Sequence, residues 1–157
     1  MSCWWEARNH VRVLGYCLHT DNTTIKWALA LKRLILPGDF MAVTGMPFDH
    51  SRNSACMRML EGSYTHLFSL DSDVIPPPDA ILKLLATGKP VVSGLYCRRS
   101  PPWSVPVAQK DGRWVTSFRA GSVIEVDVVG AGCLLMSREV LEKCPPQRPQ
   151  QGKHWFD

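Results

Sequence analysis

Two aspartates one residue apart, Asp71 and Asp73, are the side chains of this sequence that point most directly to chemistry. They follow residues 67–70, an apolar run that predicts a buried strand. Side chains alternate along an extended chain, so we expect both carboxylates on the same side of it. Two like charges held together are unfavourable unless a cation lies between them, and Mg²⁺ and Mn²⁺ prefer carboxylate oxygens and share them with phosphates. The spacing therefore predicts a divalent-metal site for a phosphate-bearing ligand.

The same tripeptide has a simpler interpretation, in which Asp73 only caps a turn. The chain contains nine aspartates in 157 residues, so about half a D-x-D tripeptide is expected by chance. The context favours the metal site, because the pair lies mid-chain after an apolar run, where α/β folds place their ligands. Prolines 76–78 then end the strand sharply.

The composition indicates a globular chain long enough for one domain with a core, since 45% of its residues are hydrophobic and 20% are charged. The net charge of +4 is small and the basic residues are scattered, so nucleic acid is not an expected partner. No apolar stretch has the length of a membrane span, and the start lacks the hydrophobic region of a signal peptide. Six cysteines without a C-x-x-C pair favour reduced thiols, so we expect a cytoplasmic protein without structural zinc.

Strands and helices alternate in the first half, which predicts a parallel sheet with right-handed crossovers. A polar turn that ends at Thr24 can cap the first helix, in which Ile25, Ala28, Leu29 and Lys32 lie at the spacing of one helix side. The expected strands span residues 11–18, 40–44, 67–70 and 91–97, and the expected helices span residues 24–36, 51–60 and 79–87.

The second half is richer in strands and glycine. Asp111-Gly112 predicts a hairpin between residues 105–109 and 114–118. Further strands are expected at 123–129 and 133–136, followed by a helix at 138–143. The whole pattern predicts an α/β domain over residues 11–157, with a mixed, mostly parallel sheet flanked by helices, after a polar lead-in of residues 1–10.

The order of these motifs is similar to that of a known enzyme family. LDSD, PPP-D, SGLYCRR and VDVVGAGCLLMSREVLE succeed one another after an S-R-N helix start, and the similarity covers residues 11–157. The sequence resembles the nucleotide-sugar-dependent glycosyltransferases of the Rossmann-like GT-A fold, closest to the family 2-like group. The resemblance implies metal-dependent transfer of a sugar from a UDP- or GDP-type donor to an acceptor.

The resemblance also implies roles for individual residues. Asp71 and Asp73, with Ser72 between them, match the D-x-D motif that binds Mn²⁺ or Mg²⁺ on the donor diphosphate. The remaining matches are the loop after the first strand beside the nucleotide base, an R-N pair near the nucleotide, and a glycine-bearing segment near donor sugar and acceptor. These positions are Tyr16, His19 and Asp21, then Arg52 and Asn53, then Gly130, Ala131 and Gly132. Simpler interpretations are a solvated helix start for Arg52 and a β-bulge at the two glycines.

No catalytic base is assigned by the resemblance. Family members carry an acidic motif downstream that serves as the base in inverting enzymes, and this chain reaches only Asp157, where that segment would begin. A metal-dependent glycosyltransferase and a truncated or non-catalytic nucleotide-sugar binding domain are therefore both open. A phosphatase of the haloacid dehalogenase type is disfavoured, because its D-x-D lies on the first strand and continues differently from Val74-Ile75.

Overall fold

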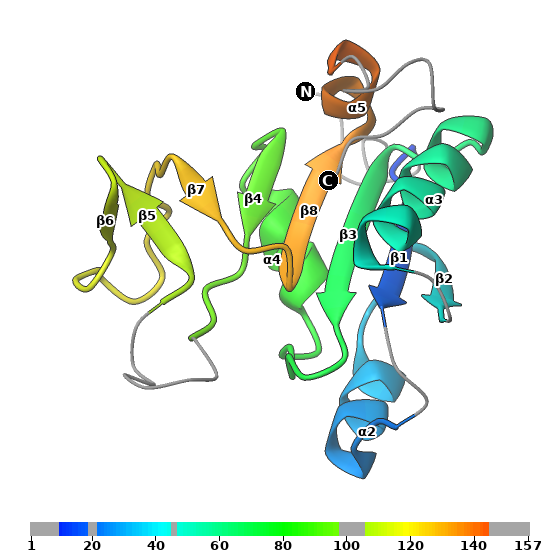
Figure 1. Ribbon diagram of the computed structural model, residues 1–157, viewed down its shortest axis with the longest axis horizontal. Coiled ribbons are helices and arrows are strands. Elements are labelled where there is room, and N and C mark those ends of the chain that lie inside the picture. Colours follow the sequence, from blue (N-terminus) through cyan, green and yellow to red (C-terminus); the bar gives the residue numbers. More distant parts are fainter. Residues whose placement is uncertain (1–9, 19–21, 45–46, 98–105, 145–157) are drawn as a thin grey trace, which may run out of the picture.

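A five-stranded mixed sheet forms the centre of the protein in the computed structural model, which describes residues 10–18, 22–44, 47–97 and 106–144 (Figure 1). Strands β1 and β3 run parallel to each other, and β2 continues the parallel part on the far side of β1. Strand β8 is antiparallel to both of its neighbours. The strand order is β2-β1-β3-β8-β4, with bounds β1 Val13–Leu18, β2 Gly38–Val43, β3 His66–Asp71, β4 Val91–Ser93 and β8 Cys133–Ser137. The predicted α/β domain with a mixed sheet flanked by helices is thus confirmed, and β8 alone opposes the other four strands of this sheet.

Strands β1 and β3 occupy the middle of the sheet because their sequences can be buried on both faces. All six residues of β1 are buried, and so are the four central residues of β3. Such continuous apolar runs are typical of strands covered by helices on both sides. The expected strands at 11–18 and 67–70 are therefore present, and the central position of β3 brings Asp71 to the carboxyl edge of the sheet.

Alternate side chains of β1 and β3 enter two separate cores. Helices α3 (Phe48–Glu61) and α5 (Arg138–Lys143) close the first core, and α2 (Ile25–Arg33) and α4 (Ala80–Ala86) close the second. The first core includes Leu14, Tyr16, Leu67, Ala55, Met59 and Leu141, and the second includes Val13, Cys17, Phe68, Trp27, Ile81 and Leu84. Successive side chains of a strand point to opposite faces of the sheet, so a residue's position along β1 or β3 decides against which helices it packs.

Helix α2 begins as predicted but presents a different side to the core. The Thr24 hydroxyl accepts a hydrogen bond from the Trp27 amide at 3.2 Å and caps the helix. The expected apolar side is wrong, because Ile25 is 80% exposed and Leu29 is 49% exposed. Trp27 is the buried residue of α2, and its indole N–H donates to the Asp71 carbonyl at 3.1 Å. The large ring and its polar group both find partners in this rotation of the helix.

Helix α3 is longer than predicted, because it begins at Phe48 directly after Pro47 rather than at Ser51. Proline is well suited to a helix start, and Asp49 in the first turn interacts favourably with the helix dipole. At the other end, the Arg138 guanidinium donates to carbonyl groups of the last turn and of the residues that follow it. Its acceptors are the carbonyls of Met59, Leu60, Gly62 and Tyr64, at 3.1, 2.6, 2.8 and 3.3 Å.

A small antiparallel sheet lies beyond β4, with the order β6-β5-β7 (Figure 1). Its strands are β5 Ala108–Lys110, β6 Arg113–Trp114 and β7 Val128–Val129. The predicted hairpin is confirmed, since Asp111 and Gly112 form its two-residue turn with φ of 51° and 71°.

Three predicted strands are too long. The chain leaves the main sheet at Gly94, so that β4 ends at Ser93 instead of residue 97. In place of the strands predicted at 114–118 and 123–129, the structure has two short strands, β6 and β7, which both pair with β5. Apolar alternation alone therefore overestimated strand length where the described chain offers no further pairing.

Among the described residues, no helix is long and apolar enough to cross a bilayer.

Candidate functional site

Asp71 is the last residue of β3, and its backbone is held from three directions. Its amide donates to the Gly132 carbonyl at 3.0 Å. Its carbonyl accepts from the Trp27 indole and from the Val74 amide, both at 3.1 Å. Residues from α2, from the turn before β8 and from the β3–α4 connection therefore fix this carboxylate at the edge of the sheet.

A tight turn, and not an extended strand, brings the two aspartates of the D-x-D tripeptide together. Strand β3 ends at Asp71, and Ser72 and Asp73 form a turn closed by the hydrogen bond from the Val74 amide to the Asp71 carbonyl. The expected alternation of the two carboxylates along a strand is therefore wrong. Both residues nevertheless line the same pocket, and the charge of Asp73 contributes to raising the pKa of Asp71.

The surroundings of Asp71 disfavour its charged form, and a bound cation would stabilise that form. Burial is the main cause that raises the pKa of Asp71, and the neighbouring Asp73 adds to it. Arg52 acts in the opposite direction, with its Nη2 atom 3.9 Å from Asp71 Oδ1. Both partners are partly open to solvent, so this long ion pair contributes little to stability.

Of the residues predicted to lie near the nucleotide, Arg52 approaches Asp71, whereas Tyr16 and Asn53 are buried. Arg52 points from α3 toward Asp71. Tyr16 is completely buried in the first core, and burial raises the pKa of its hydroxyl to about 12. Asn53 is buried as well. The structure therefore makes Tyr16 a core residue rather than a direct nucleotide contact. His19 and Asp21 lie outside the described residues.

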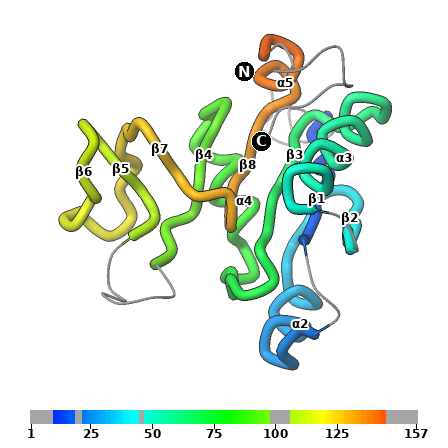
Figure 2. The backbone as a smooth tube through the Cα atoms, in the orientation of Figure 1, coloured from blue at the N-terminus to red at the C-terminus, as the bar shows by residue number. Residues whose placement is uncertain are grey.

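The glycine-bearing segment at residues 130–132 lies against Asp71, in the turn that leads from β7 into β8 (Figure 2). A Cβ atom on Gly132 would lie 2.8 Å from Asp71 Oδ2, and one on Gly130 would lie 2.0 Å from the Tyr96 hydroxyl oxygen. A larger residue at either position would therefore require the Asp71 or Tyr96 side chain to shift. The segment is a turn between two sheets rather than a bulge within one, and Ala131 between the glycines packs against the first core.

Tyr96 is a site residue that the sequence pattern did not single out. Its hydroxyl accepts a hydrogen bond from the Gly132 amide at 2.8 Å. Burial raises the pKa of Tyr96, and the negative charge of Asp71 adds to the effect, which places the hydroxyl near that carboxylate. One sequence feature could have drawn attention to the segment that carries Tyr96. Gly94 lies inside the predicted strand, and a glycine there often marks a close backbone approach. In the structure, a Cβ atom on Gly94 would lie 2.8 Å from Cys133 Sγ.

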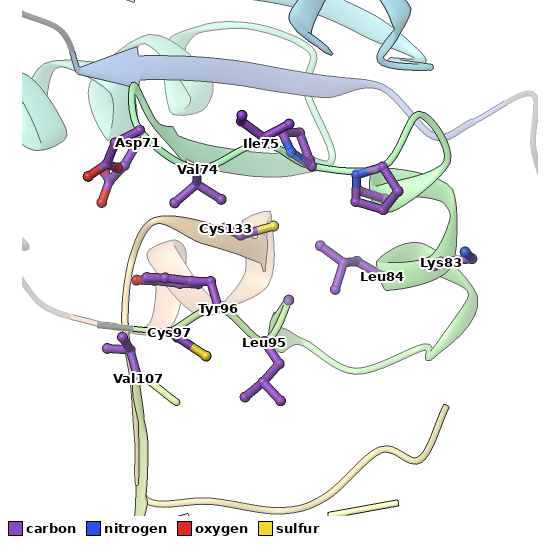
Figure 3. A pocket seen from close by; sticks show the side chains of 15 residues that line it. Asp71, Val74, Ile75, Lys83, Leu84, Leu95, Tyr96, Cys97, Val107 and Cys133 are labelled. Atoms are coloured by element: carbon purple, nitrogen blue, oxygen red, sulfur yellow. The ribbon is translucent and has the colours of Figure 1, made fainter. Parts of the chain in front are cut away.

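A pocket of about 670 Å³ opens beside these residues (Figure 3). Asp71 and Asp73 border it, together with the β3–α4 connection, helix α4 and the chain that follows β4. Its lining is otherwise mainly apolar: Val74, Ile75, Pro76, Pro77, Ala80, Leu84, Leu95, Val107 and Cys133, with Lys83, Gly94, Tyr96 and Cys97. A small organic ligand could therefore lie next to the carboxylates.

The acidic pair suits a hard divalent cation that shares its ligands with phosphate. No cluster of three or more His, Cys, Asp or Glu side chains occurs in the described part of the chain, so Asp71 and Asp73 form no all-protein cage. Mg²⁺ and its relatives are commonly held by one or two carboxylates plus substrate phosphates and water. The donor set of this site fits that mode of binding.

No protein-family model and no curated protein matches the sequence. Among solved structures, the fold is similar to the crystal structure of A197 from STIV, a viral protein, with a TM-score of 0.71. The two chains are 23% identical, and the match covers 87% of this chain and 70% of that one. At this level of identity, the similarity shows a shared fold.

Proposed function

We propose that this domain binds a nucleoside-diphosphate sugar together with a divalent cation and transfers the sugar to an acceptor alcohol. One observation carries the proposal. The Asp71 carboxylate lies at the carboxyl end of the central strand, with Asp73 in the turn that follows it, and the Arg52 guanidinium and the Gly132 backbone approach it from two other segments. Ligands of open α/β sheets bind at this position.

Each residue has a distinct part in the proposed reaction. Asp71 and Asp73 would hold Mn²⁺ or Mg²⁺, which supplies Lewis-acid stabilisation of the departing diphosphate when bound. Arg52 can add a charge-assisted hydrogen bond to a phosphate oxygen. Gly132 lets the backbone approach the Asp71 carboxylate and the Tyr96 hydroxyl closely, since a Cβ atom there would lie 2.8 Å from Asp71 Oδ2.

The reaction itself exchanges one bond for another. The acceptor hydroxyl oxygen forms a bond to the anomeric carbon, and the bond from that carbon to the diphosphate breaks. The electron pair leaves with the diphosphate oxygen, and the hydroxyl proton is released to solvent. We assign no described residue as the base, so the proposal concerns donor binding and stabilisation of the leaving group.

Thermal stability with nucleotides tests the donor site. UDP, GDP and their sugar conjugates are compared with and without Mn²⁺, on the native chain and on two isosteric variants. Asp73→Asn removes a carboxylate of the pair, and Glu61→Gln removes an exposed carboxylate beyond the opposite end of β3. A ligand that binds only the folded state at 100 times its Kd stabilises it by about 2.7 kcal/mol. We expect a Mn²⁺-dependent rise that Glu61→Gln keeps and Asp73→Asn loses. No rise with any nucleotide would contradict the proposal.

Turnover separates an enzyme from a binding domain. Release of nucleoside diphosphate that depends on an added acceptor supports transfer. Nucleotide binding without any release supports a non-catalytic domain. Release of inorganic phosphate from simple phosphate esters would instead favour phosphatase chemistry.

A further inference from the structure

The pocket beside Asp71 is divided into a polar end and an apolar end. The Asp71 carboxylate and the Tyr96 hydroxyl lie at one end, and Leu84 and Leu95 lie away from them (Figure 3). The Tyr96 hydroxyl accepts from the Gly132 amide, and a tyrosine hydroxyl that accepts one hydrogen bond can still donate one. This end therefore offers both a donor and acceptors to a hydroxyl-bearing group.

The apolar end of the pocket exposes large hydrocarbon side chains to water. Ile75 is 55% exposed and Leu95 is 48% exposed, and both line the pocket with the buried Leu84. Covering such side chains with a hydrocarbon group is favourable in proportion to the area removed from water. The lining thus favours a ligand with an apolar body.

The charges around the pocket disfavour an anionic ligand there. Apart from Asp71 and Asp73, which the proposed function assigns to the metal, Lys83 is the one charged residue of the described lining, and its ammonium pairs with Asp79, the N-cap of its helix, at 2.9 Å. The described lining therefore has no surplus positive charge for a phosphate group outside the donor site.

We propose that this pocket binds a neutral amphiphile, with a hydroxyl-bearing head beside Asp71 and Tyr96 and a hydrocarbon body against Ile75, Leu84 and Leu95. This assignment of the pocket to the acceptor rests on the proposed function. It names the substrate class as a neutral alcohol attached to a hydrocarbon group, rather than a free sugar, a peptide or a phosphorylated lipid.

Cys97 provides a direct probe of the pocket, because it is exposed and lines it. Alkylation of Cys97 by iodoacetamide is followed by peptide mass spectrometry in the presence of methyl, butyl, hexyl or octyl β-glucoside, below micellar concentrations and without metal or nucleotide. Cys144 is the matched control, since it is also exposed but belongs to the end of α5 rather than to the pocket.

We expect protection of Cys97 to increase with chain length. Binding should tighten by about fourfold for each methylene that becomes buried. A glucoside at ten times its Kd leaves about one eleventh of the protein free, so it should slow alkylation about tenfold. Methyl β-glucoside should protect little, and Cys144 should react at the same rate throughout.

Two substitutions of similarly exposed leucines test the location. Leu95→Asn places an amide in the apolar end, and Leu29→Asn makes the same change on α2, where the leucine is 49% exposed. We expect Leu95→Asn to weaken protection by octyl β-glucoside at least tenfold and Leu29→Asn to leave it unchanged. Both positions are open enough to accept the substitution without loss of the fold.

The outcomes separate this inference from the proposed function. Protection that is absent, independent of chain length or unaffected by Leu95→Asn overturns the amphiphile site, whatever the nucleotide experiment gives. Chain-length-dependent protection with no nucleotide-induced stabilisation supports the pocket while the proposed function fails. Sugar transfer to octyl but not to methyl β-glucoside would support both.

Discussion

The two ends of strand β3 differ in how their charged groups are satisfied. At the amino end, Arg138 donates to four carbonyls of the α3 terminus and its surroundings, and Arg12 Nη2 meets Asp39 at 2.8 Å. At the carboxyl end, Arg52 Nη2 and Asp71 Oδ1 are 3.9 Å apart, and burial, together with the charge of Asp73, raises the pKa of Asp71. One strand thus joins an end with short hydrogen bonds and a short ion pair to an end where two carboxylates lie close to each other beside a guanidinium.

This difference separates groups that hold the fold from groups available to a ligand. Tightly paired groups lose free energy when either partner is removed, because the remaining group is left without its hydrogen bond. Two carboxylates that lie close together gain when a cation binds between them. We therefore expect substitutions at the amino end to lower stability and substitutions at the carboxyl end to lower ligand affinity.

The largest expected effect is at Arg138. Arg138→Met leaves the carbonyls around the end of α3 without their donor and should reduce the free energy of unfolding by about 2–4 kcal/mol. Arg113→Met removes an exposed arginine from β6 and should change it little. Urea unfolding followed by circular dichroism measures both. Equal stability of the two variants would break the comparison, because it would remove the structural role assigned to the amino end.

An intermediate effect is expected on ligand binding at Arg52. Arg52→Gln should weaken metal-dependent nucleotide binding about tenfold or more, the loss of one hydrogen bond to a charged group. Arg58→Gln is the matched control on the same helix, since Arg58 acts electrostatically on Asp39 and Tyr64 at the amino end. Calorimetric titration of both variants with nucleotide and Mn²⁺ gives the affinities. Equal weakening by the two substitutions would mean that net charge, rather than position, governs binding.

The smallest expected effect concerns Asp39, which is exposed. Hydrogen bonds from Tyr64 and Arg12 lower its pKa in the folded state. A carboxyl whose folded-state pKa is lowered contributes stability above its unfolded pKa and loses it as the pH falls through the folded value. Asp39→Asn should therefore be slightly less stable than the native chain at neutral pH and equally stable in acid, with the difference shrinking in high salt. A constant difference at all pH values would show that packing, not charge, links Asp39 to its partners.

Local chemistry in the sequence was sufficient for several elements. Residues 67–70 are continuously apolar and form a central strand, and Thr24 caps the first helix because its hydroxyl needs only a nearby backbone amide. Asp111 and Gly112 form the predicted hairpin turn because both can adopt positive φ. The contact of the Gly132 segment with Asp71 was not predicted, because the family resemblance implied only that this segment lies near donor sugar and acceptor.

Other features depend on partners that are distant in sequence. The expected strands at 91–97 and 123–129 are short, because a strand extends only as far as its neighbours pair with it. The side of α2 that faces the core is the one that carries Trp27, whose indole donates to the Asp71 carbonyl. This acceptor lies 44 residues further along the chain. No periodicity reveals such a contact.

The sequence by itself determined the apolar strands, the turn chemistry and the acidic pair, because these depend on neighbouring residues. Only the tertiary structure decided that a turn, rather than an extended strand, holds Asp71 near Asp73, that Tyr16 belongs to the core and that Tyr96 belongs to the site. The physical reason is that burial and close approach are properties of the packed sheet. Tyr96 meets Gly132 across 36 residues of chain, and only the antiparallel pairing of β8 with β3 and β4 brings those segments together.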